Sequence, residues 1–227
     1  NIKLNETRIN AWQNIDIKPG DRLAIAPPQH GLRTYIAVTG GFKAVSNTGA
    51  ESSHWQQNRD LNLDKHNQIF YDENCFKRLT SDATPARFIP NYDAPLTLQL
   101  IPAYQYEQFS EQAINTLLTQ KYTISPMSNR MGYRLQGEPI TFCEEALLSE
   151  GIAYGSVQIP PNGQPIVLLK DRQTIGGYPK LGCISQQDCF KLGQRRPGQE
   201  ITFTLKTAEH CLQQLRTFYQ FFSATNS

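Results

Sequence analysis

Three segments of the chain concentrate side chains that could bind or activate a small polar molecule. The first, residues 125–139, places Ser128, Asn129 and Arg130 in a row, with Arg134 shortly after them. A guanidinium offers a fork of N–H donors that suits a carboxylate or a phosphate. The same residue types also describe an ordinary exposed strand with cationic side chains, which is the commoner case.

The second segment, residues 147–166, contains a carboxylate between a serine and a glycine, directly before an apolar stretch. This residue, Glu150, could act as a general base or orient the amine of a substrate. A lone glutamate in a loop is more often a solvated surface group. Gln158 and Gln164 flank the turn predicted at residues 161–163 and add amide groups to the segment.

The third segment, DRQTIGGYPK at residues 171–180, follows the apolar run 166–169 and carries more polar groups than a hairpin turn needs. Its side chains could hydrogen-bond a small polar substrate, and its two glycines permit positive φ and a close approach of the backbone to a ligand. It matches neither G-x-x-x-x-G-K-[ST] nor G-x-G-x-x-G, so it is a poor phosphate loop. The candidate substrate-binding residues here are Asp171, Gln173, Thr174, Gly176, Gly177 and Tyr178.

Several other classes of function are disfavoured by composition and spacing. The five cysteines include no C-x-x-C pair and the four histidines no H-x-x-H pair, which predicts reduced thiols, a cytoplasmic protein and no metal site. No G-x-S-x-G motif is present. The net charge is +2 with scattered basic residues, so we expect no nucleic-acid partner. No apolar run approaches the ~20 residues of a membrane span, so we expect no membrane partner.

Most of the chain consists of short strand patterns separated by turns, with few helices. The most regular helix pattern follows Ser110, a predicted N-cap, and Ser185 is the predicted cap of a second, shorter helix. A third helix is predicted from about residue 207 to 222. Strands are predicted at 22–25, 32–38, 96–100, 155–160, 165–170 and 200–205.

The pattern of strands predicts two β-rich units that form barrels rather than a doubly wound sheet. Residues 43–95 are polar, contain three prolines, and read as loops that end in a connection near residues 90–95. The segments KPGDRLAI and RPGQEITF echo each other, one in each half. We therefore predict domains at 1–95 and 96–227. The chain opens without Met in the middle of a turn-and-strand pattern, and we expect the first domain to be incomplete.

Longer stretches resemble a known family. SPMSNRMGYRLQG, LLSEGIAYGSVQIPPNGQPIVLLKDRQTIGGYPKLGCI, RRPGQEITF and KPGDRLAIAPPQHGLRTYIAVTGGF are similar to the family of the 5-oxoprolinase C subunit (KipA) and allophanate hydrolase subunit 2. That family also includes the carboxyltransferase domain of biotin-dependent urea carboxylases. The resemblance covers residues 18–42 and 96–205 in order and implies tandem cyclophilin-like β-barrels, the first of them incomplete here.

The resemblance also implies an activity and partners. The leading expectation is a subunit of an ATP-dependent hydrolase that opens 5-oxoproline to glutamate, inactive without a KipI-like B subunit and a third subunit. One alternative is a carboxyltransferase module that uses biotin in a urea carboxylase. Another is a regulatory protein that binds a KipI-like kinase inhibitor. Read through the family, Glu150, Asp171 and Arg130 are the expected catalytic residues, facing a lactam or urea in one polar site.

Overall fold

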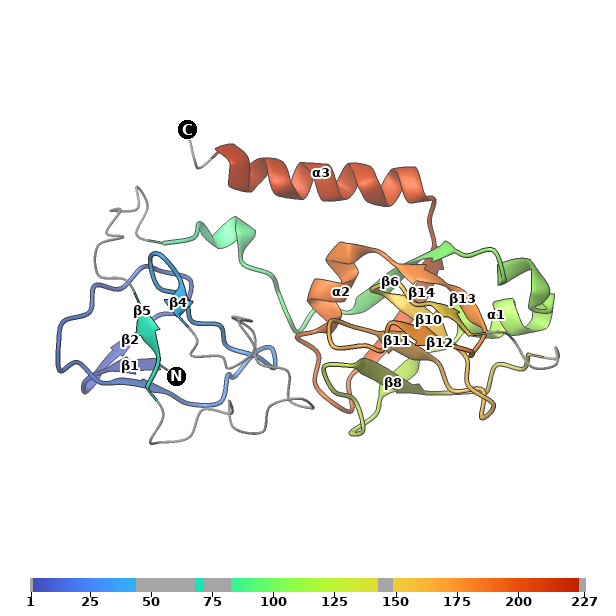
Figure 1. Ribbon diagram of the computed structural model, residues 1–227, viewed down its shortest axis with the longest axis horizontal. Coiled ribbons are helices and arrows are strands. Elements are labelled where there is room, and N and C mark those ends of the chain that lie inside the picture. Colours follow the sequence, from blue (N-terminus) through green and yellow to red (C-terminus); the bar gives the residue numbers. More distant parts are fainter. Residues whose placement is uncertain (1, 44–67, 72–82, 143–148, 225–227) are drawn as a thin grey trace. The chain divides into compact units, whose positions relative to one another are not determined.

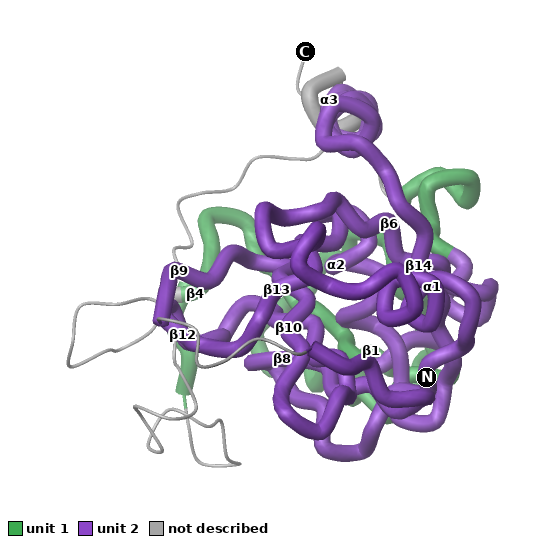
Figure 2. Tube along the Cα trace, turned by 90° about the vertical axis from the view of Figure 1, so that its right-hand side faces the viewer, with its two compact units in different colours: residues 1–29, 33–90 green, residues 30–32, 91–227 purple. Residues whose placement is uncertain are grey.

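The computed structural model describes residues 2–43, 68–71, 83–142 and 149–224. The chain divides into two compact units, residues 1–29 with 33–90 and residues 30–32 with 91–227 (Figure 2). Most of the loops predicted over residues 43–95 lie outside the described residues. Each unit is considered by itself.

The first unit contains short strands in two small antiparallel sheets. The strand predicted at 22–25 is confirmed. The one predicted at 32–38 is wrong, because this segment pairs with no strand among the described residues, and Tyr35 is 79% exposed. Apolar, β-branched residues favour a strand only where a neighbour can pair with them. The elements are β1 (Ile2–Leu4), β2 (Thr7–Ile9) and β3 (Leu23–Ile25) in the order β2-β1-β3, β4 (Phe42–Lys43) paired with β5 (Phe70–Tyr71), and the 3₁₀ helix η2 (Ala86–Phe88).

The second unit is built on a closed seven-stranded β-barrel (Figure 1). The barrel confirms the prediction of a mainly β chain. A second closed barrel is not seen in the described parts of the chain, and the cyclophilin-like tandem stays a prediction. The strands, in barrel order, are β10 (Ser156–Gln158), β11 (Ile166–Leu168), β8 (Gly132–Gln136), β7 (Tyr122–Ile124), β14 (Glu200–Leu205), β6 (Leu96–Pro102) and β13 (Lys180–Ile184), with β6 and β14 parallel.

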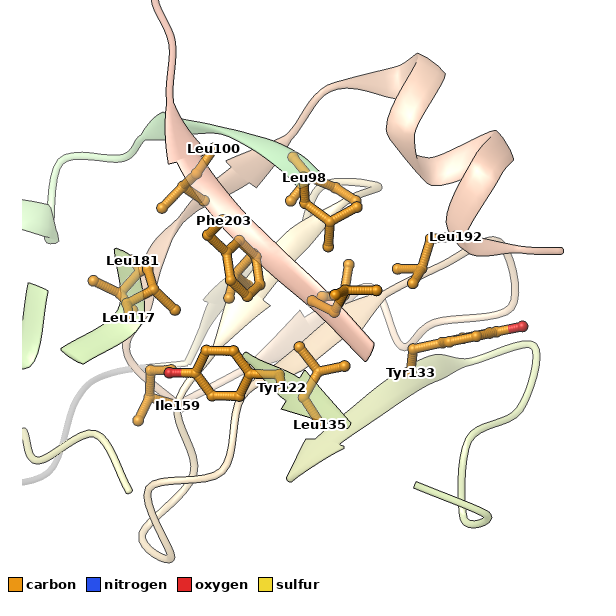
Figure 3. Packing of buried hydrophobic residues seen from close by; sticks show 14 of the residues in the cluster. Leu98, Leu100, Leu117, Tyr122, Tyr133, Leu135, Ile159, Leu181, Leu192 and Phe203 are labelled. Carbon is orange, nitrogen blue, oxygen red and sulfur yellow. The ribbon is translucent and has the colours of Figure 1, made fainter. Parts of the chain in front are cut away.

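Alternate residues of these strands fill the barrel with one apolar core (Figure 3). Leu98 and Leu100 of β6 are fully buried, as the alternation of this strand predicts. Tyr122 meets Phe203 edge to face, with ring centroids 5.7 Å apart. Leu117 of helix α1 (Glu111–Thr119) belongs to the same cluster. The core therefore fixes the register of the barrel strands, among them β10, which carries the candidate residue Gln158.

The three predicted helices are present. Ser110 caps α1 by accepting a hydrogen bond from the backbone N–H of Ala113, and Ser185 caps α2 (Gln186–Leu192) through the N–H of Asp188. Helix α3 (Ala208–Ala224) agrees with the third prediction within two residues, and a 3₁₀ turn, η3 (Tyr106–Gln108), precedes α1. No helix among the described residues is long and apolar enough to cross a bilayer.

One cysteine of α2 gives a first testable prediction. Cys189 is 2% exposed, and burial raises the pKa of its thiol to about 12. On the order of one thiol in 10⁴ to 10⁵ is then ionised near neutral pH, and the thiolate is the reactive form. We expect iodoacetamide to leave Cys189 unmodified in the folded protein, while the more exposed Cys183 reacts. Peptide mass mapping before and after unfolding in urea checks this; equal labelling rates for the two cysteines would contradict it.

Candidate functional site

The candidate site lies on the outer face of the barrel, where a two-stranded ribbon covers β10 and β11. Val157 and Val167 point into the core, whereas Ile166 and Leu168 form a separate cluster with Ile152. The ribbon consists of β9 (Glu150–Gly151) and β12 (Ile175–Gly176), which pair antiparallel (Figure 2). Because both faces of β10 and β11 are covered, polar side chains on their outer face are withdrawn from water.

The ribbon approaches the barrel closely at Gly176. A Cβ built there would lie 2.7 Å from Cδ1 of Ile152 and 3.3 Å from Nε2 of Gln158. Neither Gly176 nor Gly177 is among the glycines with positive φ, so the structure does not use the freedom that these glycines permit. A side chain at position 176 would force the Ile152 side chain, and to a smaller extent that of Gln158, to move.

An ion pair joins the ribbon to the barrel. Oε1 of Glu150 lies 2.5 Å from Nζ of Lys180, whose side chain is 8% exposed, and Nζ also donates to the carbonyl of Gly151 at 3.1 Å. Tyr104 donates its hydroxyl to Oε2 of Glu150. Burial opposes ionisation of Glu150, but the hydrogen bonds from Lys180 and Tyr104 outweigh it and lower the pKa of this carboxyl. The same bond raises the pKa of Tyr104.

An unpaired amide lies beside this ion pair. Gln158 is 1% exposed, and its Nε2 has no hydrogen-bond partner in the part of the chain that the structure describes. Gln158 is the cross-strand neighbour of Lys180, and Gly176 is that of Glu150. A buried amide without a partner costs on the order of 1–3 kcal/mol. Such a group is a candidate donor to the carbonyl of a ligand.

Lys180 and Tyr104 were missed as site residues by the sequence analysis. Lys180 ends the DRQTIGGYPK segment and opens the apolar strand β13, and a lysine at that register is placed on the outer face opposite Gln158. A lysine at the start of an apolar strand was the sequence signal that could have identified Lys180 as a site residue. Tyr104 lies in the turn after β6 and had none.

The other predicted catalytic pair, Arg130 and Asp171, forms a separate cluster. Nη2 of Arg130 donates to Oδ1 of Asp171 at 3.2 Å, and Nε lies 2.8 Å from Oδ2 without the alignment of a hydrogen bond. The Asp171 side chain is 8% exposed and that of Arg130 is 53% exposed. The pair lies beyond the end of β8 and β11 where Gly132 pairs with Leu168. No hydrogen bond or ion pair among the described residues joins it to Glu150.

Several predicted substrate-binding residues instead hold loops in place. Ser128 exchanges hydrogen bonds with the backbone of Arg134, whose side chain is exposed. Asn129 accepts from the backbone N–H groups of residues 131 and 132, and Gln164 bonds both backbone groups of Gly137. These interactions are local turn and loop contacts. Three other predicted substrate-binding residues of the segment 171–180 are exposed: Gln173, Thr174 and Tyr178.

The described residues contain no group of three or more metal-ligating side chains. Four side chains meet where the ribbon contacts the barrel, and we call them the ribbon site: the carboxylate of Glu150, the ammonium of Lys180, the phenol of Tyr104 and the carboxamide of Gln158. Together these groups both donate and accept hydrogen bonds, so the site is suited to a small molecule that carries N–H and C=O groups side by side.

Comparison with known proteins shows the family of the chain. Residues 1–205 match the model of the carboxyltransferase domain, subdomain A and B, and the chain belongs to this family. It is 32% identical over 217 residues to the C subunit of 5-oxoprolinase from Escherichia coli K12, covering 93% of this chain and 68% of that protein. The corresponding C subunit from Haemophilus influenzae is 28% identical, with 89% and 65% covered. The resemblance stated from the sequence is confirmed.

Solved structures give the same fold. The crystal structure of TTHA0988 superposes with a TM-score of 0.73 at 30% identity, covering 89% of this chain and 39% of that one. The Kluyveromyces lactis urea amidolyase superposes with a TM-score of 0.81 at 19% identity, over 93% of this chain and 14% of its own. The chain thus spans about two thirds of the 5-oxoprolinase relatives and a small part of the urea-processing enzyme.

Proposed function

We propose that the chain works as a subunit of an ATP-dependent 5-oxoprolinase complex and holds the lactam group of 5-oxoproline at the ribbon site. The observation that carries this proposal is the buried, unpartnered Nε2 of Gln158 beside the Glu150–Lys180 ion pair. The two relatives named as C subunits of 5-oxoprolinase support the substrate class.

The side chains of the site complement a cyclic amide. A lactam has its N–H and its C=O on the same side of the C–N bond, so one acceptor and one donor next to each other can bind both. Glu150 supplies the acceptor, and Gln158 supplies the donor. Paired hydrogen bonds of this kind discriminate strongly, because an analogue that lacks one partner leaves a buried group unsatisfied.

Lys180 adds a positive charge near the bound carbonyl. Two of its three N–H donors go to Glu150 and to the carbonyl of Gly151, which leaves one for a ligand. Ring opening needs negative charge to build up on the amide oxygen, and a fixed cation in a site withdrawn from water stabilises that charge. Phosphorylation of the same oxygen by ATP would activate the ring carbon. Water then adds to this carbon, and the C–N bond breaks as the nitrogen takes up a proton. A second water hydrolyses the resulting acyl phosphate to glutamate and inorganic phosphate.

ATP and the other subunits belong to the proposal. The relatives are named as one lettered subunit of 5-oxoprolinase, which implies further subunits, and we assign to this chain a KipI-like B subunit and a third subunit as partners. The half-exposed Arg130, held by Asp171, is the candidate for contact with phosphoryl oxygens. Since this pair is separate from the ribbon site, Arg130 would contact the phosphate groups of the nucleotide and not the lactam nitrogen.

The test is phosphate release from ATP by the co-purified complex of the full-length protein with its KipI-like and third-subunit partners. Phosphate release that depends on 5-oxoproline, and not on urea, is expected. An intact complex that releases no phosphate with either compound contradicts the enzymatic proposal and favours the regulatory alternative, in which a KipI-like partner is bound without turnover.

A carboxyltransferase that uses biotin is the second candidate. It is favoured by the match of residues 1–205 to the carboxyltransferase-domain model and by a 26% identical relative described as a putative urea carboxylase of Emericella nidulans. Urea also offers an N–H beside a C=O, so the ribbon site fits it as well. Transfer of label from carboxybiotin to urea, with no ATP-dependent opening of 5-oxoproline, would establish this candidate over the first.

A further inference from the structure

The two oxygens of the Glu150 carboxylate are held by groups of very different burial. Oε1 is 2.5 Å from the ammonium of Lys180, a residue that is 7% exposed. Oε2 accepts the hydroxyl of Tyr104, a residue that is 68% exposed. Lys180, which makes the first contact, is buried in barrel strand β13, whereas the side chain of Tyr104, which makes the second, is largely in solvent.

The backbone on either side of Tyr104 is fixed independently of that hydroxyl. Ala103 donates its N–H to the carbonyl of Leu181 at 3.1 Å. Gln105 is 3% exposed, and its Oε1 accepts from the backbone N–H of Lys180 at 2.7 Å. The ring of Tyr104 can therefore rotate away from Glu150 while the turn keeps its place, and exposed side chains change rotamer in picoseconds to nanoseconds.

Oε2 is also the Glu150 oxygen that a ligand can reach, because Lys180 holds the other one. The unpartnered Nε2 of Gln158 lies on the same part of the ribbon and barrel, next to Gly176. A ligand whose carbonyl accepts from Gln158 presents its N–H toward Glu150. The hydroxyl of Tyr104 then occupies the position that this N–H needs.

We infer that Tyr104 is a positioning residue that holds the place of the substrate N–H on Glu150 and is displaced when an amide binds. In the ligand-free protein its hydroxyl keeps the carboxylate oriented and ionised. On binding, one hydrogen bond to Oε2 replaces another, so the aromatic side chain competes directly with the ligand. This inference rests on the proposed function only for the identity of the ligand.

The first measurement is the kinetics of the complex with Tyr104→Phe, which removes only the competing hydroxyl. The expected result is a KM for 5-oxoproline lower by about two- to tenfold, the range of one net hydrogen bond, with kcat little changed. Tyr106→Phe is the matched control. Its ring packs on the barrel core two residues further on, and this variant is expected to behave as wild type. An unchanged or higher KM in Tyr104→Phe overturns the inference.

A second readout separates this inference from the proposed function. In the complex containing 3-fluorotyrosine, the ¹⁹F resonance of Tyr104 is the one missing from the Tyr104→Phe sample. Adding 5-oxoproline, or separately urea, should shift this resonance. Turnover without a shift removes the positioning role and keeps the proposed function. A shift without turnover keeps the positioning role of Tyr104 and removes the proposed function. If neither compound gives turnover or a shift, both the positioning role and the proposed function are overturned.

Discussion

Lys180→Met is expected to reduce the 5-oxoproline-dependent phosphate release of the complex by about 100-fold or more, the effect of losing one preorganised charged donor to a developing oxyanion. The substitution also removes the partner of Glu150 inside the covered face, where Lys180 is 8% exposed and Glu150 is 29% exposed at the side chain. Breaking a buried pair from one side costs about 3 kcal/mol. Steady-state kinetics and a urea unfolding curve measure the two effects.

Two further variants show whether the loss of activity comes from the site or from the fold. Lys121→Met breaks an ion pair with Glu200 at 2.9 Å in which both side chains are more than half exposed, and it is expected to change neither activity nor stability appreciably. Adding Glu150→Gln to Lys180→Met removes the unpaired carboxylate and should recover stability without recovering activity. Near wild-type turnover in a folded Lys180→Met complex would contradict the role given to the ammonium.

Gly182→Ala is expected to destabilise the barrel more than any other single methyl added at the described glycines. A Cβ at this position of β13 would lie 2.2 Å from the carbonyl oxygen of Ile101 and 3.0 Å from Cδ1 of Leu100. Neither neighbour can yield easily, because β6 and β13 are paired in the ladder that closes the barrel. We expect a loss of about 3 kcal/mol or more, seen as a lower urea midpoint by far-ultraviolet circular dichroism.

Gly151→Ala is the matched control for this prediction. A Cβ there would meet nothing within 4 Å, and its backbone φ is not positive. The added methyl group should change the free energy of unfolding by no more than about 0.5 kcal/mol. If Gly182→Ala unfolds at the same urea concentration as Gly151→Ala, the close contact between β6 and β13 is not as described.

Local sequence signals predicted the elements whose stability is local. Ser110 and Ser185 are N-caps that satisfy backbone donors of their own helices, and both helices were found from these residues. The alternation of Leu96, Leu98 and Leu100 also predicted strand β6, and its distant partners β13 and β14 are present in the structure. The segment around Tyr35 has equally strong strand propensity, yet it has no paired neighbour in the described structure. Strand formation there depends on residues distant in sequence, which a single segment cannot reveal.

The candidate site was predicted in part. Glu150, Gln158 and Gly176 were singled out by residue type and resemblance, and the β9–β12 ribbon brings them together on the outer face of the barrel. Lys180 and Tyr104 were not found, because their contacts with Glu150 depend on the barrel register and on a turn after β6. Arg130 and Asp171 were placed in the same site, but their ion pair lies beyond the other end of strands β8 and β11.

If the lactam binds between Glu150 and Gln158, a crystal structure of the complex with 5-oxoproline will show it there. We expect the ring carbonyl oxygen about 3 Å from Nε2 of Gln158, the ring N–H on Oε2 of Glu150, and the side chain of Tyr104 turned away. A lactam bound elsewhere, for example on Arg130, with Nε2 of Gln158 still unpartnered and Tyr104 still on Glu150, would contradict it.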